Sequence, residues 1–180
     1  MIIVAEPLIL ILFGEKWRQV ISYFQILSIS GLFYPMNAIN LNILKVKGRS
    51  DLFLKLEIIK EVLMFVFIFF ILILKSNIYG FLWVIVITSF IAYFINAFYS
   101  KKLINYSFWE QFKDIFKIIL STSLTMFFTY FLTIIFNFNI YISLFLKLFL
   151  GLLFYTIFSF LLKIEELNTV FKFLKQFKRK

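Results

Sequence analysis

The chain has 180 residues, a net charge of +10, neither cysteine nor histidine, 63% hydrophobic residues and only 16% charged residues. A soluble globular domain has about 45–50% apolar and about 25% charged residues, so this composition is typical of a protein whose solvent is the lipid bilayer. The lack of Cys and His excludes thiolate and imidazole metal sites, cysteine nucleophiles, disulfides and a Ser-His-Asp triad.

Residues 1–18 are expected to form the end of a truncated helix and an outer loop. The apolar run 1–13 is interrupted by Glu6 and Pro7 and is shorter than the ~20 residues that a spanning helix needs. It has neither the basic region nor the small-residue cleavage site of a signal peptide. Trp17, in the polar sequence that follows, is typical of a membrane interface.

Region 19–163 consists of five long apolar segments and the short connections between them. Each is long enough for a tilted transmembrane helix, and none alternates polar and apolar residues as a barrel strand would. The sequence therefore predicts an all-α integral membrane protein with five transmembrane helices. The first of them is expected to be broken at Gly31 and Pro35. The segments are 19–46, 52–74, 78–99, 112–136 and 140–162.

The basic residues predict the orientation. If all five segments span, the connections within 45–60 and 101–117 and the tail 163–180 lie on one side, and they hold 15 of the 19 basic residues. The positive-inside rule then places the N-terminus outside and the C-terminus in the cytoplasm. Lys16, Arg18, Lys75 and Lys147 remain on the outer side or close to it.

The tail 164–180 is expected to be a cationic amphipathic helix on the cytoplasmic surface. Its apolar residues recur at i, i+3, i+4, i+7 and i+10, with Lys172, Lys175 and Arg179 on the other side. Beside five spans, such a helix binds anionic membrane lipids rather than nucleic acid. The apolar positions are Leu167, Val170, Phe171, Leu174 and Phe177.

Polar side chains along segment 19–46 are candidates for a substrate path. Tyr23, Ser30, Tyr34 and Asn37 fall on one helical stripe, and Asn40 extends it toward the cytoplasmic end. Such groups face a solvated cavity or other protein, because polar groups at membrane depth are costly. Alternatively, they bond neighbouring helices or the carbonyls that Pro35 frees.

Charged residues open segment 52–74. Glu57 and Lys60 can pair, and Glu57 and Glu61 share a face. One interpretation is an ordinary interfacial helix start. The other is a carboxylate at the mouth of a cavity that handles cations or protons, which adds these three residues to the candidate path.

The hydroxyls of segment 112–136 and the lysine of segment 140–162 have simpler interpretations. Thr125, Thr129 and Thr133 are spaced by four, which favours bonds to carbonyls one turn back or to a neighbouring helix. Lys147 can extend outward to the interface. No metal site and no cofactor is expected, and without paired carboxylates in a loop no enzymatic activity is expected either.

Two stretches of the sequence resemble a known family. They are AEPLILILFGEKW at residues 5–17 and NLNILKVKGRSD at residues 40–51. Together they resemble the oligosaccharide flippase (polysaccharide transporter) family, in its colanic-acid-exporter-like branch of the multidrug/oligosaccharidyl-lipid/polysaccharide exporter superfamily. The residues that carry the resemblance are Gly14, Glu15, Lys16, Trp17, Gly48, Arg49 and Asp51.

The resemblance implies a place in a fourteen-helix exporter fold, with the five segments as its tenth to fourteenth helices. Family members move lipid-linked oligosaccharides across the bacterial cytoplasmic membrane for export of cell-surface polysaccharide. The resemblance thus implies the C-terminal part of such a flippase, inactive without its N-terminal part. A small membrane scaffold that packs against other envelope polysaccharide synthesis proteins is the alternative. A membrane transferase is a third hypothesis, disfavoured by the short loops.

Overall fold

The computed structural model describes residues 1–135 and 138–164, and every regular element in these residues is helical. The predicted all-helical class is therefore confirmed. Apart from Ile164, the expected amphipathic tail 164–180 lies outside the described residues. In chain order the elements are α1 (Ala5–Phe13), the 3-10 helix η1 (Glu15–Trp17), α2 (Val20–Ser30), α3 (Tyr34–Val46), α4 (Ser50–Ile73), α5 (Ile78–Ile104), α6 (Phe108–Ile135) and α7 (Ile140–Leu161).

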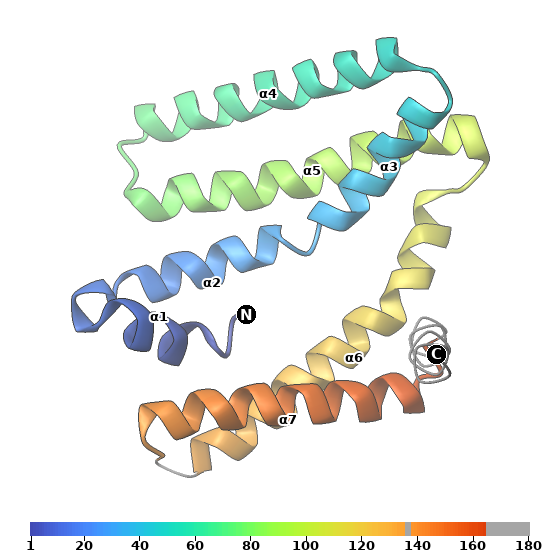
Figure 1. Ribbon diagram of the computed structural model, residues 1–180. Helices are drawn as coiled ribbons and strands as arrows, with labels where there is room; N and C mark the ends of the chain where they lie inside the picture. Colours follow the sequence, from blue (N-terminus) through green and yellow to red (C-terminus); the bar gives the residue numbers. More distant parts are fainter. Residues whose placement is uncertain (136–137, 165–180) are drawn as a thin grey trace, which may run out of the picture.

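Helix α5 is the centre of the larger group of helices. It packs against α2, α3 and α4, and Figure 1 shows α4, α5 and α2 following one another as layers. Helix α6 leaves the end of α5 at a steep angle and pairs with α7 (Figure 1). Helix α1 contacts both α2 and α7, so it also links the group around α5 to the α6–α7 pair.

Three of the described helices, α5, α6 and α7, are long and apolar enough to cross a membrane. Helix α4 has 24 residues, but Glu57, Lys60 and Glu61 lie within its apolar run. Helices α2 and α3 have 11 and 13 residues, and each is too short to cross alone. The three spans agree with the sequence, whereas the five-span topology stays a prediction.

The predicted break in segment 19–46 is confirmed and separates α2 from α3. The chain makes a tight turn there, in which the N–H of Leu32 donates to the carbonyl of Ile29 at 3.1 Å and that of Phe33 to the carbonyl of Ser30 at 3.0 Å. Pro35 lies in the first turn of α3, where a missing N–H is tolerated. The helical periodicity that relates Tyr23 to the later residues of the stripe is thus interrupted.

Local capping sets the ends of α5 and the start of α6. The side chain of Asn77 accepts a hydrogen bond from the N–H of Tyr79 at 3.1 Å, and Asn105 ends α5 with a φ of +53°. Ser107 and Glu110 then form a reciprocal pair: the N–H of Ser107 donates to the carboxylate, and the N–H of Glu110 donates to the hydroxyl. Both helices are therefore longer than the predicted segments 78–99 and 112–136. Helix α5 continues to Ile104, and α6 already begins at Phe108.

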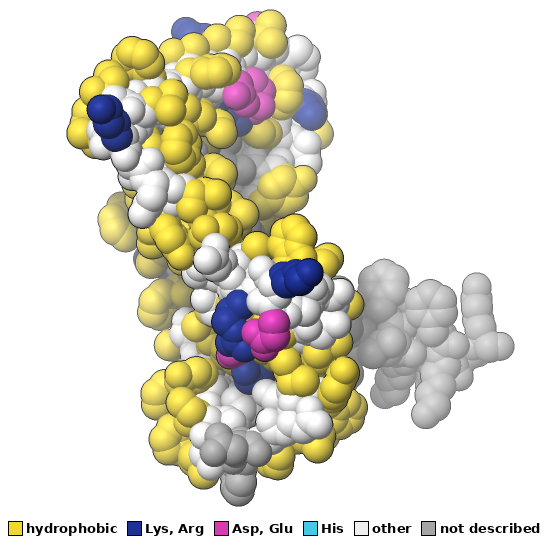
Figure 2. Space-filling view, turned by 90° about the vertical axis from the view of Figure 1, so that its left-hand side faces the viewer, with side chains coloured by type: hydrophobic (Ala, Val, Ile, Leu, Met, Phe, Trp, Pro, Cys, Tyr) yellow, Lys and Arg dark blue, Asp and Glu magenta, His cyan; other side chains and the backbone are white. Residues whose placement is uncertain are grey.

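Burial in α6 and α7 is reversed relative to a soluble protein. The fully or nearly buried residues of these two helices are polar, whereas Phe127 and Phe145 are 64% and 68% exposed. Figure 2 shows one face of the molecule, on which apolar side chains dominate and charged ones form small clusters. This pattern fits a lipid environment, where polar groups join helices and apolar groups face outward. The buried polar residues are Gln111, Ser121, Thr125, Thr129 and Ser159.

Candidate functional site

The predicted path residues of α2 and the start of α3 do not meet in one place. The ring of Tyr23 packs edge-on against Tyr79 of α5, with 5.3 Å between ring centroids. The hydroxyl of Ser30 donates to the carbonyl of Leu27 in its own helix at 2.7 Å. Tyr34 is 76% exposed. None of these three side chains contributes to a described pocket wall.

Asn37 and Asn40 instead bind neighbouring helices. The amide of Asn96 in α5 donates to the Oδ1 of Asn37 at 2.7 Å, and the Nδ2 of Asn37 donates to the carbonyl of Ser89 at 3.2 Å. Asn40 and Gln111 of α6 exchange two hydrogen bonds. The helix-packing interpretation thus accounts for these two residues.

Two of the amides in this network, Asn96 and Gln111, were not singled out by the sequence analysis. Asn96 is fully buried and Gln111 is 5% exposed. Asn96 is the single amide in the apolar run 78–99, which is a signal that could have identified it. Gln111 follows the polar start of α6 and gives no such signal.

One face of α5 adds polar atoms that have no partner among the described residues. The hydroxyl of Tyr93, the Oδ1 of Asn96 and the hydroxyl of Ser100 are buried and unbonded in this part of the chain. Their spacing of three and four places them on one helical face. We call the interface formed by Asn37, Asn40, Tyr93, Asn96, Ser100 and Gln111 the amide seam. Its neutral donors and acceptors can hold water or hydroxyl groups, and they supply no charge for an anion.

The charged residues of α4 lie apart from this seam. Glu57 and Lys60 form an ion pair within one turn, and Glu61 is exposed. None of the three lines either described pocket. The ion pair with an adjacent exposed carboxylate agrees with an interfacial helix start.

An open groove lies between α1, α2, α6 and α7, and it contains the polar groups best suited to a ligand. Its volume is about 450 Å³, within the ~300–1,000 Å³ of ligand sites. Apolar residues from the N-terminal segment and α6, among them Ile2, Ile3, Met126 and Phe127, form much of its wall. Five polar side chains interrupt that apolar wall, and we call this groove the polar groove. They are Glu6, Gln25, Ser123, Tyr130 and Lys147.

The two charges of the polar groove have opposite signs and come from distant parts of the chain. Lys147 of α7 is partly buried, and Glu6 of α1 lines the same wall. Glu6 also accepts a hydrogen bond from Arg18 at 3.4 Å. The Nε2 of Gln25 donates to the carbonyl of Ile2 at 3.1 Å, which ties α2 to the segment before α1. The groove thus offers an ammonium, a carboxylate, an amide and hydroxyls on an apolar background.

The first of the two stretches that carry the resemblance builds the turn between α1 and α2. Gly14 has a φ of +83°, which favours glycine, and Arg18 donates two hydrogen bonds to the carboxylate of Glu15 at 2.8 and 2.7 Å. That hydrogen bonding holds the pKa of Glu15 below its usual value. Trp17 packs against Phe13, with ring centroids 6.0 Å apart, and Lys16 is exposed.

The second motif builds the turn between α3 and α4 in the same manner. Gly48 has a φ of +68°, and the N–H of Arg49 donates to the carbonyl of Leu44 at 2.9 Å. The guanidinium of Arg49 donates to both oxygens of Asp51 at 3.0 and 2.9 Å, which lowers the pKa of Asp51. In both motifs, a left-handed glycine precedes a bidentate arginine–carboxylate pair that stabilises the turn.

Within the described residues, no three side chains of the His, Cys, Asp and Glu types gather to form a metal site. Comparison of the chain with protein-family models, with curated proteins and with solved structures found no match.

Proposed function

We propose that the chain is the C-terminal part of a lipid-linked oligosaccharide flippase for export of cell-surface polysaccharide. It acts together with an N-terminal part, as the resemblance of residues 5–17 and 40–51 to the family implies. It lies in the bacterial cytoplasmic membrane with five spans, its N-terminus outside and its C-terminus in the cytoplasm. In this topology α2 and α3 together make one broken span, and α4 begins at the cytoplasmic interface.

The polar groove is the observation that carries the proposal. A flippase must offer hydrogen-bonding groups to sugar hydroxyls and a cation to the diphosphate while the substrate crosses hydrocarbon. Gln25, Ser123 and Tyr130 supply donors and acceptors, and Lys147 supplies a positive charge. In the proposal, the groove rather than the amide seam lies along the substrate path, since Asn37 and Asn40 bind other helices.

The test is restoration of surface polysaccharide in a bacterial strain that lacks its own flippase. The chain alone is expected to fail, and the chain joined to its N-terminal part is expected to succeed. In the joined protein, Lys147→Met is expected to lower export at least tenfold because it removes the cation of the groove. Lys75→Met, which changes an exposed lysine outside the groove, is the matched control and is expected to retain export.

Three outcomes would contradict the proposal. Restoration by residues 1–180 alone would show that no N-terminal part is needed. Equal export by the Lys147 and Lys75 variants would show that the polar groove does not lie along the substrate path. Failure of the joined protein, together with stable capture of polysaccharide synthesis enzymes by the chain, would favour the scaffold alternative.

A further inference from the structure

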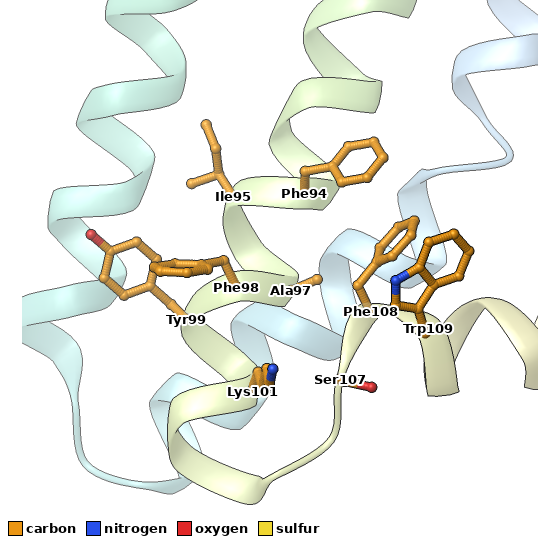
Figure 3. Close-up of a pocket in the computed structure, with 9 residues that line it drawn as sticks. All are labelled: Phe94, Ile95, Ala97, Phe98, Tyr99, Lys101, Ser107, Phe108 and Trp109. Carbon is orange, nitrogen blue, oxygen red and sulfur yellow. The ribbon is translucent and has the colours of Figure 1, made fainter.

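A second groove lies at the junction of α5 and α6, away from the polar groove. It has a volume of about 530 Å³ and is lined from α5 by Phe94, Phe98 and Lys101 and from the start of α6 by Phe108 and Trp109 (Figure 3). We call it the junction groove. Its wall is almost entirely apolar, which distinguishes it from the polar groove.

The aromatic wall of the junction groove is held in place by contacts among its own rings. Phe94 and Phe108 are stacked with 4.6 Å between centroids, and Trp109 packs edge-on against Phe108 at 5.4 Å. Phe108 also contacts the buried ring of Tyr93 at 5.5 Å. Trp109 is 68% exposed, so an aromatic surface stays open to the surroundings. An extended hydrocarbon chain fits such a surface, because it needs apolar contact and no hydrogen bonds.

Positive charge is concentrated at one end of this groove. Lys101 lies at the same end as Ser107 in the close-up view (Figure 3) and forms no ion pair with any described residue. The neighbouring Lys102 lies over the ring of Phe98 with its Nζ 4.5 Å from the centroid.

The carboxylates of Glu110 and Asp114, near the start of α6, accept local hydrogen bonds. Glu110 accepts a hydrogen bond from the N–H of Ser107 at 2.6 Å, and Asp114 accepts one from the hydroxyl of Tyr106. These bonds fix both carboxylates at the junction. Lys101 interacts electrostatically with Glu110 but forms no ion pair with it, so its ammonium can donate to an external anion.

We propose that the junction groove binds one anionic phospholipid. An acyl chain lies against Phe94, Phe98, Phe108 and Trp109, and the phosphate meets the ammonium of Lys101. Basic pockets between membrane helices bind acidic headgroups, and tryptophan is enriched at the same depth. The apolar wall selects a lipid over a free anion, and the cationic end selects an anionic headgroup over a zwitterionic one. This inference is independent of the flippase proposal.

Trp109 makes the site measurable. The chain has three tryptophans, and the other two, Trp17 and Trp83, are exposed. Replacing both by Phe leaves Trp109 as the single tryptophan, whose fluorescence is quenched by bromine atoms on a nearby acyl chain. The full chain is placed in phosphatidylcholine vesicles that contain either brominated phosphatidylglycerol or brominated phosphatidylcholine at the same low mole fraction. We expect at least twofold stronger quenching by the brominated anionic lipid.

The role of Lys101 is tested by Lys101→Gln against Lys117→Gln in the same background. Both lysines are exposed, but Lys117 does not line the groove. Lys101→Gln is expected to weaken the relative affinity for the anionic lipid about fivefold, the fold-change that about 1 kcal/mol per basic residue produces. Lys117→Gln is expected to change it less than twofold.

Equal quenching by the two brominated lipids would overturn the proposal, because it would show no selection for the anionic headgroup. Equal losses in the two lysine variants would also overturn it, because they would indicate general surface charge instead of a site. Displacement of the brominated anionic lipid by inorganic phosphate at constant ionic strength would show recognition of the anion alone and contradict the lipid-binding groove.

Discussion

Asn40 of α3 and Gln111 of α6, 71 positions apart in the sequence, bind each other through both of their side-chain amides. The Nδ2 of Asn40 donates to the Oε1 of Gln111 at 2.9 Å, and the Nε2 of Gln111 donates back to the Oδ1 of Asn40 at 3.2 Å. Both residues are buried, with exposed fractions of 1% and 5%. Because α6 packs mainly against α7, this pair ties the α6–α7 hairpin to the helices around α5.

Removing one partner of this pair is expected to cost more than removing both. Asn40→Leu leaves the buried amide of Gln111 without its partner, so the free energy of unfolding is expected to fall by about 1–2 kcal/mol. The double variant Asn40→Leu/Gln111→Leu is expected to recover part of that loss. Reversible unfolding of the detergent-solubilised chain by dodecyl sulfate measures both effects.

Asn42→Leu is the matched control for that experiment. Asn42 lies in the same helix but is exposed, so its replacement is expected to change the free energy by less than about 0.5 kcal/mol. Equal losses from the Asn40 and Asn42 variants would show that the Asn40–Gln111 pair does not hold the helices together.

The close approach of α6 and α7 depends on two small residues. Ser121 and Ser159 are fully buried, and their hydroxyl oxygens lie 3.0 Å apart. Ser159→Ala is expected to cost only about 0.6 kcal/mol, a typical hydrogen bond between membrane helices, whereas Ser159→Leu is expected to cost about 1–3 kcal/mol by overpacking. The same unfolding assay applies. Thr156→Leu, at an exposed position of α7, controls for the larger side chain, and a similar cost there would contradict the explanation.

The α3–α4 turn is expected to weaken in acid. The hydrogen bonds from Arg49 lower the pKa of Asp51 below its ordinary 3.8 in the folded protein. A folded-state pKa below the unfolded one stabilises the fold above pH 3.8, and this stabilisation is lost as the pH falls through the lowered value. Thermal midpoints of the native chain and of Asp51→Asn are therefore expected to differ at neutral pH and to converge in strong acid. In the Arg49→Gln background, the midpoints with Asp51 and with Asp51→Asn are expected to stay close at every pH, because the arginine partner is absent. In the native background, a difference between the midpoints that persists in strong acid would contradict this account.

The topology can be tested by single cysteines, because the chain has none of its own. Ser76→Cys and Ser50→Cys change one atom each at exposed positions on opposite sides of the predicted α4 span. The positive-inside distribution predicts that an impermeant thiol reagent labels intact cells at position 76 and labels position 50 only after lysis. The reverse pattern would show that the orientation is inverted. Equal labelling of both positions in intact cells would show that α4 does not span the membrane.

The sequence predicted those parts of the fold that depend on long runs of apolar residues. The apolar runs beginning at residues 52, 78 and 140 match α4, α5 and α7 within two residues at their starts, because each follows a short polar turn. The break at Gly31 and Pro35 was also predictable, since both residues disfavour a continuous helix. The end of α5 was missed by five residues, because its limit depends on the left-handed cap at Asn105.

Most of the candidate site could not be predicted, because helical periodicity identifies faces and not partners. Nothing local to Asn40 indicates Gln111, and nothing local to Lys147 indicates Glu6 in the same groove. The sequence favoured an outward-extending Lys147 because it lies within two turns of the outer end of its segment. The threonines of α6 follow their predicted spacing in part. Thr125 and Thr133 donate to the carbonyls one turn back, whereas the buried hydroxyl of Thr129 has no partner among the described residues.

The break between α2 and α3 restricts what can surround this side of the protein. Pro35 has no N–H with which to reach the carbonyl of Gly31, the partner that it would have in a continuous helix. If α2 starts at the outer surface, the break lies about 16 Å deep, near the bilayer midplane. Gly31 and Leu32 are exposed there. Hydrocarbon penalises a carbonyl without a partner by several kcal/mol, so lipid is the wrong neighbour for this turn. In that topology the break has to lie against water or another polypeptide, and a partner would approach from that side.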